Sequence, residues 1–515
     1  MTTHTGLPMS WSEWFALDGV DLADLIRKGK ITTNEVIAQA TAGVLRVDSE
    51  LEGVLELFED VRQNADSNSP NRSGTLYGVP VFLKDLGSRM AQRAQESGSR
   101  LLRGNISDVT DPLINNYLRA GLIPFGRSTT PEFGMSFDTS TNYLGAVKVT
   151  RNPWNSEHTP GGSSGGSAAL VAAGVTPISM ASDGGGSTRV PASYCGLVGL
   201  KASRGRISMP LNHSEYTWRI AVEGVVTRSV RDSAAVLDYL HAKPVGGTFY
   251  PMASPRGSYL ESLTTPPQQM KIALSTGRWG RDVECDGAVV DRILAVARVL
   301  ESLGHNIQEI EDEKLCDWEL MWNTYITQWI CGRIMYLSVA QLHGVNPTEM
   351  EGMLSPMVFR HFDKAQSYTT LDLLQAIAGN NTITRSFGSL FENWDILLCP
   401  THAIRVPVAN GPYSLLRDEP LESWLSRMVD AGRYTMPGNE AGLPGISIPA
   451  GVDNDGLPVG AMLYAGQGRE DLVLRLAAAI EVAKPEWFAR MPLINVDVGP
   501  SKSSGRTEQQ SIAMR

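Results

Sequence analysis

The chain has 515 residues, of which 42% are hydrophobic and 19% charged, and its formal net charge is −10 at pH 7. This acidic balance argues against nucleic acid or an anionic membrane surface as a partner, because both bind basic faces. The five cysteines and eight histidines are scattered without metal-ligand spacing, so we expect reduced thiols, no metal and no cofactor. No cationic leader and no long apolar run is visible, which favours a cytoplasmic protein without a membrane partner.

The first third of the chain is predicted to be mainly helical. A capping box opens one helix, since Glu35 stands three residues after Thr32. Apolar residues then recur at helical spacing, namely Val36, Ala40, Val44 and Leu45. Residues 76–86 are rich in β-formers but contain Pro80, which predicts an edge or irregular strand rather than a central one. Residues 111–121 read as a helix closed by a glycine.

Strand and helix patterns alternate through the rest of the chain. Short strands are predicted within residues 121–134, 174–182, 194–201, 394–401 and 442–453. Amphipathic helices are predicted at 229–240, 286–304 and 470–483. This alternation is typical of an α/β fold. We expect one large domain over residues 1–498, with a helix-rich insertion at about 313–395, and a disordered tail at 499–515.

Two glycine and serine clusters, Thr159–Leu170 and Ser182–Arg189, are candidates for function. The first runs directly into an apolar helical stretch, unlike a flexible linker, and N–H groups at such a start can hold negative charge. The alternative is a tight turn before a buried helix. In the second cluster, three glycines before Ser187 could aim their N–H groups at one point, as in an oxyanion hole, or could simply form a turn.

Named motifs narrow the chemistry of these clusters. A phosphate-binding loop needs a lysine and then a serine or threonine after its last glycine, and these are absent. Residues 161–165 fit the G-x-S-x-G nucleophile elbow, but Pro153 and Pro160 break the strand that should precede it. Lys84 lies in an apolar run that could desolvate it into a base, or it could pair with Asp85 at a strand end.

The order of these motifs resembles that of the amidase signature hydrolases, and the resemblance spans most of residues 20–490. It rests on the segments "GVPVFLKDL", "GRSTTPEFG", "TRNPWN", "WDILLCPT", "GLPGISIPAG" and residues 161–208. The resemblance implies an α/β fold with a large mixed β-sheet core covered by helices on both faces. It also implies a triad of Ser187 as nucleophile, Ser163 as a bridging serine with a cis peptide bond and Lys84 as base. The implied oxyanion donors are the N–H groups of Gly184, Gly185, Gly186 and Ser187.

Several positions depart from the family pattern. Gly184 stands where threonine is usual, and Arg127 where lysine is usual. Gly438 replaces an aromatic residue before Asn439, so both are candidate substrate-pocket residues. These departures bear on substrate preference and leave the triad untouched.

The expected activity is hydrolysis of C–N bonds in aryl amides, oligoamides and carbamates (urethanes), through an acyl-enzyme on Ser187. The resemblance is to the single-chain branch with aryl acylamidases, aminohexanoate-oligomer hydrolases and urethane-cleaving amidases. Two alternatives remain, a glutaminase-type subunit of a tRNA-dependent amidotransferase and a non-catalytic binding scaffold. The expected partner is a small-molecule substrate, and the expected state is a monomer or homodimer.

Residues 204–224 form a long connection without clear periodicity. They carry Met209 and Trp218, which is unusual apolar content for a surface loop. We hypothesise that this loop is one wall of the substrate pocket and admits bulky aromatic groups, with room left opposite it by Gly438. The alternative is that its aromatic residues pack on the core.

Overall fold

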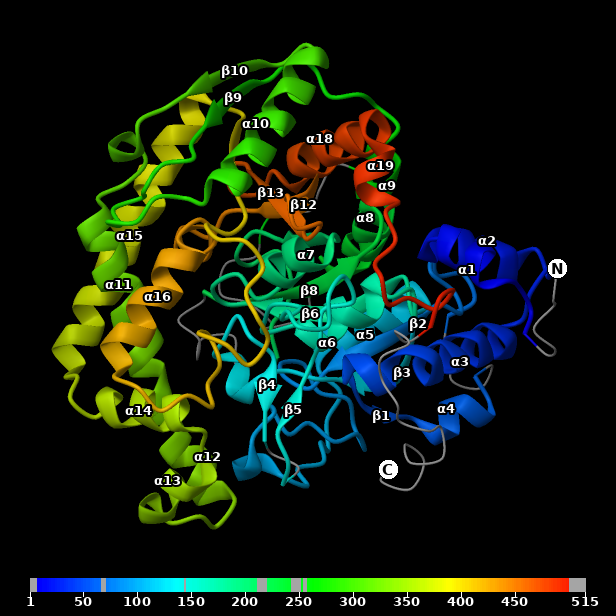
Figure 1. Ribbon diagram of the computed structural model, residues 1–515, viewed down its shortest axis with the longest axis horizontal. Helices are drawn as coiled ribbons and strands as arrows, with labels where there is room; N and C mark the ends of the chain where they lie inside the picture. The colour runs from blue at the N-terminus through cyan, green and yellow to red at the C-terminus, as the bar shows by residue number, and fades with distance from the viewer. Residues whose placement is uncertain are drawn as a thin grey trace.

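The computed structural model describes residues 7–65, 71–142, 145–210, 220–241, 252 and 257–499. A single sheet of eleven strands runs through the molecule (Figure 1). In spatial order its strands are β1 (Val54–Leu57), β3 (Ile123–Ser128), β2 (Pro80–Lys84), β6 (Ile178–Asp183), β8 (Val222–Thr227), β7 (Val198–Lys201), β12 (Gly445–Val452), β13 (Pro458–Tyr464), β11 (Ile396–Pro400), β9 (Lys271–Leu274) and β10 (Asn306–Glu309). A separate two-stranded sheet pairs β4 (Ser140–Thr141) with β5 (Lys148–Val149).

The large sheet is mixed. Strand β2 runs parallel to β3 and β6, and β9 runs parallel to β10 and β11. The central strands β6, β8, β7, β12, β13 and β11 pair antiparallel with their neighbours in that order. The mixed sheet and its helices confirm the predicted α/β fold.

Strand β2 lies inside the sheet, between β3 and β6, so the expectation of an edge strand is wrong. Pro80 is its first residue, where a missing N–H disturbs the ladder least. The register with β3 shifts between Val81 and Phe82, so the strand is irregular, as expected. Its last residue is Lys84.

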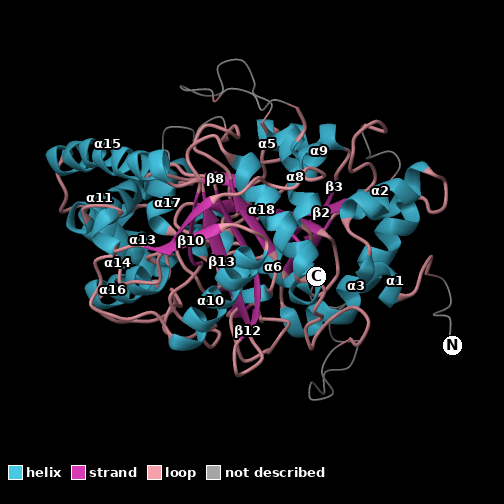
Figure 2. Ribbon diagram, turned by 90° about the horizontal axis from the view of Figure 1, so that it is seen from above, coloured by secondary structure: helices cyan, strands magenta, loops and turns pink. Residues whose placement is uncertain are grey.

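Helices cover both faces of the sheet (Figure 2). Those of the first half are α1 (Trp11–Ala16), α2 (Gly19–Arg27), α3 (Thr33–Leu51), α4 (Glu59–Gln63), α5 (Pro112–Ala120), α6 (Gly165–Ala172), α7 (Arg189–Cys195), α8 (Val230–Leu240) and α9 (Tyr259–Ser262). Those packed near the C-terminal strands are α10 (Gly287–Ser302), α18 (Glu470–Ala483) and α19 (Pro485–Phe488).

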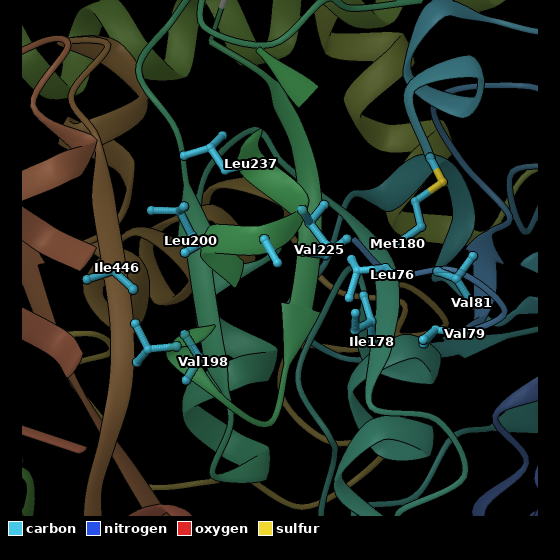
Figure 3. Packing of buried hydrophobic residues seen from close by; sticks show 14 of the residues in the cluster. Leu76, Val79, Val81, Ile178, Met180, Val198, Leu200, Val225, Leu237 and Ile446 are labelled. Atoms are coloured by element: carbon cyan, nitrogen blue, oxygen red, sulfur yellow. The ribbon is translucent and has the colours of Figure 1, made fainter. Parts of the chain in front are cut away.

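Side-chain alternation along β8 shows how the two faces are filled. Val225 belongs to the large core cluster, whereas Val226 packs in a smaller cluster with residues of α6 and α7. Figure 3 shows Val225 in this cluster with Leu200 of the neighbouring β7, Ile446 of β12 and Leu237 of α8. The sheet is therefore buried on both sides, which fixes the strand ends that carry the site.

A second group of helices lies beyond one side of the sheet, at the left in Figure 1. It comprises α11 (Trp318–Cys331), α12 (Tyr336–Leu342), α13 (Met350–Met353), α14 (Pro356–Ala365), α15 (Thr370–Asn393), α16 (Leu421–Gly432) and α17 (Met436–Glu440). These helices share an aromatic core with β11 and β13. The helix-rich character predicted for residues 313–395 is thus confirmed. Among the described residues, no helix is both long and apolar enough to span a membrane.

Local signals explain the helix starts. At α3, Thr32 Oγ1 accepts from Glu35 N at 3.2 Å and Thr32 N donates to Glu35 Oε2 at 2.8 Å, which is the predicted capping box. The predicted apolar stripe is buried except for Leu45, which is 69% exposed and therefore lies off the buried face. The expected tail lies outside the described residues from position 500 onwards.

Candidate active site

Lys84, at the end of β2, is buried among hydroxyl groups. The residue is 1% exposed. Its Nζ donates to Ser163 Oγ at 2.7 Å and to Ser182 Oγ at 2.9 Å. The alternative pairing with Asp85 is wrong, because Asp85 Oδ1 accepts from Arg127 Nη1 at 2.7 Å. Sequence reasoning missed Ser182, although it opens the second glycine cluster.

Ser163 lies where the first glycine and serine cluster enters α6. Its peptide bond with Gly162 is cis. A Cβ at Gly162 would stand 2.3 Å from the Ser136 carbonyl oxygen, so only glycine fits this close approach. The backbone N–H of the adjacent Ser164 donates to the Ser187 carbonyl at 3.2 Å. The cluster is therefore a packed support that joins the two serine segments, and the linker interpretation fails.

Ser187 lies on the turn between β6 and α7, and a buried ion pair holds this turn. The Asp183 carboxylate accepts from the N–H groups of Gly186 at 2.7 Å and Thr188 at 3.2 Å, and from Arg189 Nε at 2.8 Å. Burial alone would raise the pKa of Asp183, but the Arg189 guanidinium outweighs it and holds the pKa well below its usual range. The turn is thus anchored from inside the protein.

The four expected oxyanion donors are not equivalent. The Gly186 N–H is already bonded to Asp183, which corrects the expectation that all four N–H groups are available. No acceptor in the described part of the chain takes the N–H of Gly184, Gly185 or Ser187. Gly185 and Ser187 also line an apolar pocket beside the Ser187 side chain. Their N–H groups are therefore the best placed of the four to donate to a bound substrate.

Asn439 and Gly438 lie behind the glycine loop, which is formed by residues 184–186, and they do not line the pocket beside Ser187. Asn439 Oδ1 accepts from Arg189 Nη2 at 2.6 Å, and its Nδ2 donates to the Asp183 carbonyl at 2.9 Å. A Cβ at Gly438 would stand 2.3 Å from the ring of Tyr464. The expectation that Gly438 leaves room for substrate is therefore wrong, because Tyr464 fills that space.

Sequence reasoning also missed the buried network of Asp183, Arg189 and Tyr464. Arg189 donates to the hydroxyl of Tyr464, which in turn donates to the Tyr434 carbonyl at 2.8 Å. The available signal was the pair of opposite charges that flanks the glycine run. Two opposite charges that are buried must pair with each other, so their presence on both sides of the glycine run indicates a turn with a fixed conformation.

Burial makes the neutral form of Lys84 accessible near pH 7. Burial lowers the pKa of Lys84 to about 7, against the charges of Asp183 and Glu223, which favour the ammonium form. Burial also raises the pKa of Glu223 to about 7, although Ser88 N donates to its Oε1 at 2.7 Å. A large fraction of Lys84 is therefore neutral near pH 7 and able to accept a proton.

An apolar pocket opens beside Ser187. Its lining comes mainly from the 134–137 segment, α11 and α16. Besides Ser136 and Ser187, the side chains that line it are Met135, Phe137, Tyr325, Ile326, Trp329, Trp424, Leu425, Met428, Val429 and Met436. None of the residues that line this pocket is charged. Within the described ranges, no group of three or more His, Cys, Asp or Glu side chains could hold a metal ion. The part of this wall that α11 supplies, Tyr325, Ile326 and Trp329, lies in residues 313–395, where Trp, Met and Tyr are abundant in the sequence.

The residues proposed for the 204–224 loop are only partly described. Met209 is half-buried and does not line the pocket beside Ser187. Trp218 lies in residues 211–219, outside the described residues. A role for this loop as a pocket wall stays a prediction.

Comparisons with known proteins agree on one protein family. The family model described as Amidase matches residues 35–474. A 6-aminohexanoate-cyclic-dimer hydrolase of Paenarthrobacter ureafaciens is 34% identical over 501 residues, covering 92% of this chain and 96% of that protein. Its namesake from Pseudomonas sp. (strain NK87) is 31% identical over 509 residues, with 92% and 96% covered. A solved structure of 6-aminohexanoate cyclic dimer hydrolase superposes with a TM-score of 0.85 at 30% identity, covering 93% of this chain and 99% of the other.

Proposed function

The chain belongs to the amidase family, and from that premise we propose that it is a serine hydrolase that cleaves uncharged amides through an acyl-enzyme on Ser187. Hydrolysis of amide C–N bonds is the activity of the family. The observation that carries the specific proposal is the buried contact from Lys84 Nζ to Ser163 Oγ at 2.7 Å, with the pKa of Lys84 lowered to about 7 by burial. A lysine in this setting can act as a base without a histidine.

In the proposed first step, neutral Lys84 takes the proton of Ser163 while Ser163 takes that of Ser187. Ser187 Oγ then bonds to the substrate carbonyl carbon, and the N–H groups of Gly185 and Ser187 donate to the oxyanion. The C–N bond breaks as the proton returns through Ser163 to the departing amine. Water, deprotonated along the same route, then releases the acid and restores Ser187. The scheme uses no cofactor and no second chain.

The apolar pocket supports aryl amides and uncharged oligoamides as substrates, because its lining offers no charged side chain. The relatives' names make a cyclic aminohexanoate amide one natural candidate. A carbamate presents a similar carbonyl group to Ser187 and would leave a carbamoyl group on it, so the proposal includes urethanes. Free glutamine is a poor fit, because its charged amino and carboxylate groups would enter the pocket unpaired.

A substrate panel tests this proposal. Purified enzyme should hydrolyse p-nitroanilides, a cyclic aminohexanoate oligoamide and aryl carbamates, and should release little ammonia from glutamine. Ser187→Ala should abolish each of the observed activities. A fluorophosphonate probe should label the native chain and fail on the variant, which also tests the binding-scaffold alternative. Absence of both turnover and labelling in the native enzyme would refute the proposal.

A further inference from the structure

Helix α11 reaches the glycine loop through one hydroxyl group. Tyr325 is 3% exposed, and its hydroxyl donates to the Gly184 carbonyl at 3.3 Å. A Cβ at Gly185 would stand only 2.1 Å from the same hydroxyl oxygen, so the tyrosine lies directly against the loop. We propose that Tyr325 is a positioning residue that orients the Gly184–Gly185 peptide so that the Gly185 N–H faces the oxyanion; this inference rests on the proposed function.

The orientation follows from peptide geometry. In a trans peptide the C=O and the following N–H point in opposite directions. The Gly184 carbonyl and the Gly185 N–H belong to one such peptide, so a donor that holds the carbonyl turns the N–H to the opposite side. Gly185 lines the pocket beside Ser187, and no described group accepts its N–H.

In the next peptide of the loop, between Gly185 and Gly186, both the carbonyl and the N–H have hydrogen-bond partners within the protein. Thr435 Oγ1 donates to the Gly185 carbonyl at 2.7 Å, and the Gly186 N–H of that peptide donates to Asp183 at 2.7 Å. The loop is thus held by one hydroxyl on each of two successive carbonyls. Of these two peptides, the one held by Tyr325 keeps its N–H for substrate, whereas the N–H of the other is bonded to Asp183.

Tyr325 also connects the loop to the pocket wall. Its ring stacks on Trp329, one turn later on α11, with centroids 6.0 Å apart and planes at 17°. Both rings line the pocket. Burial raises the pKa of Tyr325, so the hydroxyl stays protonated and remains a donor throughout the working pH range. A substrate packed on Trp329 is therefore held by the same helix that orients the oxyanion donor.

The test compares Tyr325→Phe with the native enzyme on a p-nitroanilide. The variant keeps the ring and loses only the hydroxyl, so we expect kcat to fall about tenfold while KM changes less than twofold. The loss is smaller than the hundredfold or more typical of deleting an oxyanion donor, because the donor stays and only its orientation is loosened. The midpoint of the pH profile should not move, since Lys84 is untouched.

Tyr117→Phe provides the matched control. Tyr117 is a buried tyrosine whose hydroxyl donates to the Gly224 carbonyl at 2.8 Å, and it does not line the pocket. We expect its kcat to stay at the native value. An unchanged kcat in Tyr325→Phe, or a tenfold rise in KM with a lowered Tm, would overturn the inference. Failure of the proposed function would differ, since the native enzyme itself would then show no Ser187-dependent turnover.

Discussion

The proposed base is an amine whose basicity depends on its surroundings. Lys84 has two hydroxyl partners at hydrogen-bonding distance, while the carboxylates of Asp183 and Glu223 act on it only through their charge. Desolvation favours the neutral amine and these charges favour the ammonium form. The balance sets the pH at which Lys84 can start the reaction.

We expect kcat/KM to rise with pH through a midpoint at about 7 and then to reach a plateau. The sign follows from the lowered pKa, because Lys84 loses its proton above that value and becomes the working base. Initial rates on a neutral anilide between pH 5 and 9 would measure the profile. A flat profile would contradict this assignment, and so would a midpoint near 10, the value expected of an exposed lysine.

The same reasoning assigns a role to Glu223 that a variant can isolate. Glu223→Gln removes a negative charge that favours the ammonium form, so the midpoint should move to lower pH. Glu481→Gln is the matched control, because burial also raises the pKa of Glu481 to about 7 but its carboxylate contacts Val230. Its profile should overlay that of the native enzyme.

Dismantling the triad should give non-additive losses. We expect Ser187→Ala to abolish turnover, Lys84→Ala to reduce it by several orders of magnitude and Ser163→Ala to reduce it somewhat less. The double variant with both Lys84→Ala and Ser163→Ala should have a kcat only slightly below that of the less active single variant. The reason is that each single variant and the double variant interrupt the same proton path. Measurable activity in Ser187→Ala with none in Ser163→Ala would favour the nucleophile elbow instead.

At the scale of elements, α11 and the 204–224 loop are the two candidates for the part of the pocket wall that determines substrate preference. Trp329→Ala should lower kcat/KM for aryl amides about tenfold more than for small aliphatic amides, because a pocket-lining ring is lost. Met209→Ala should have the same selective effect only if the loop forms a wall, as the sequence suggests. Paired measurements of both variants, with Tm recorded, decide between the two elements.

The packing of α17 on β13 predicts a stability effect. Gly438→Ala would place its Cβ against the Tyr464 ring, whose hydroxyl is tied to Arg189 and to the Tyr434 carbonyl, so the ring cannot move freely. We expect a loss of about 1–3 kcal/mol in the free energy of unfolding, measured in urea.

Gly388→Ala is the control for this substitution. Gly388 lies within α15 and a Cβ there meets nothing within 4 Å, so alanine should stabilise by about 1 kcal/mol through helix propensity. A Gly438→Ala protein as stable as the native one would restore the idea that this position is open.

The elements themselves were largely predictable where local chemistry sets them. The capping box at Thr32 and the glycine after Ala120 mark helix ends that the structure reproduces. Strand β2 was wrongly expected at the edge of the sheet. The effect of Pro80 on strand pairing depends on its position within the strand, and the β-rich run alone did not show that the strand begins at this residue. The Tyr464 contact at Gly438 was equally hidden, because it joins residues 26 positions apart that only the fold brings together.

At the scale of the whole molecule, the strand order lay beyond sequence reasoning. Strand β11 lies beside β9, and β7 lies beside β12, so neighbours in space are often distant in the chain. Hydrophobic patterns report burial but carry no information on which strand pairs with which. The candidate triad could be proposed because the motifs contain its residues, whereas the pocket wall was sought in residues 204–224 and the described residues that line the pocket lie elsewhere in the chain.

The pocket suggests how this enzyme can acquire new substrates in evolution. The proposed reacting groups are carried by β2, the start of α6 and the turn after β6, whereas much of the wall comes from α11 and α16. Mutations in those two helices can reshape the cavity without displacing the proton path, so selection can explore new amides at little risk to the chemistry. Tyr325 is an exception, since it both lines the pocket and donates to the Gly184 carbonyl. A library that randomises the wall should therefore recover variation at Trp329 and Trp424 far more readily than at Tyr325.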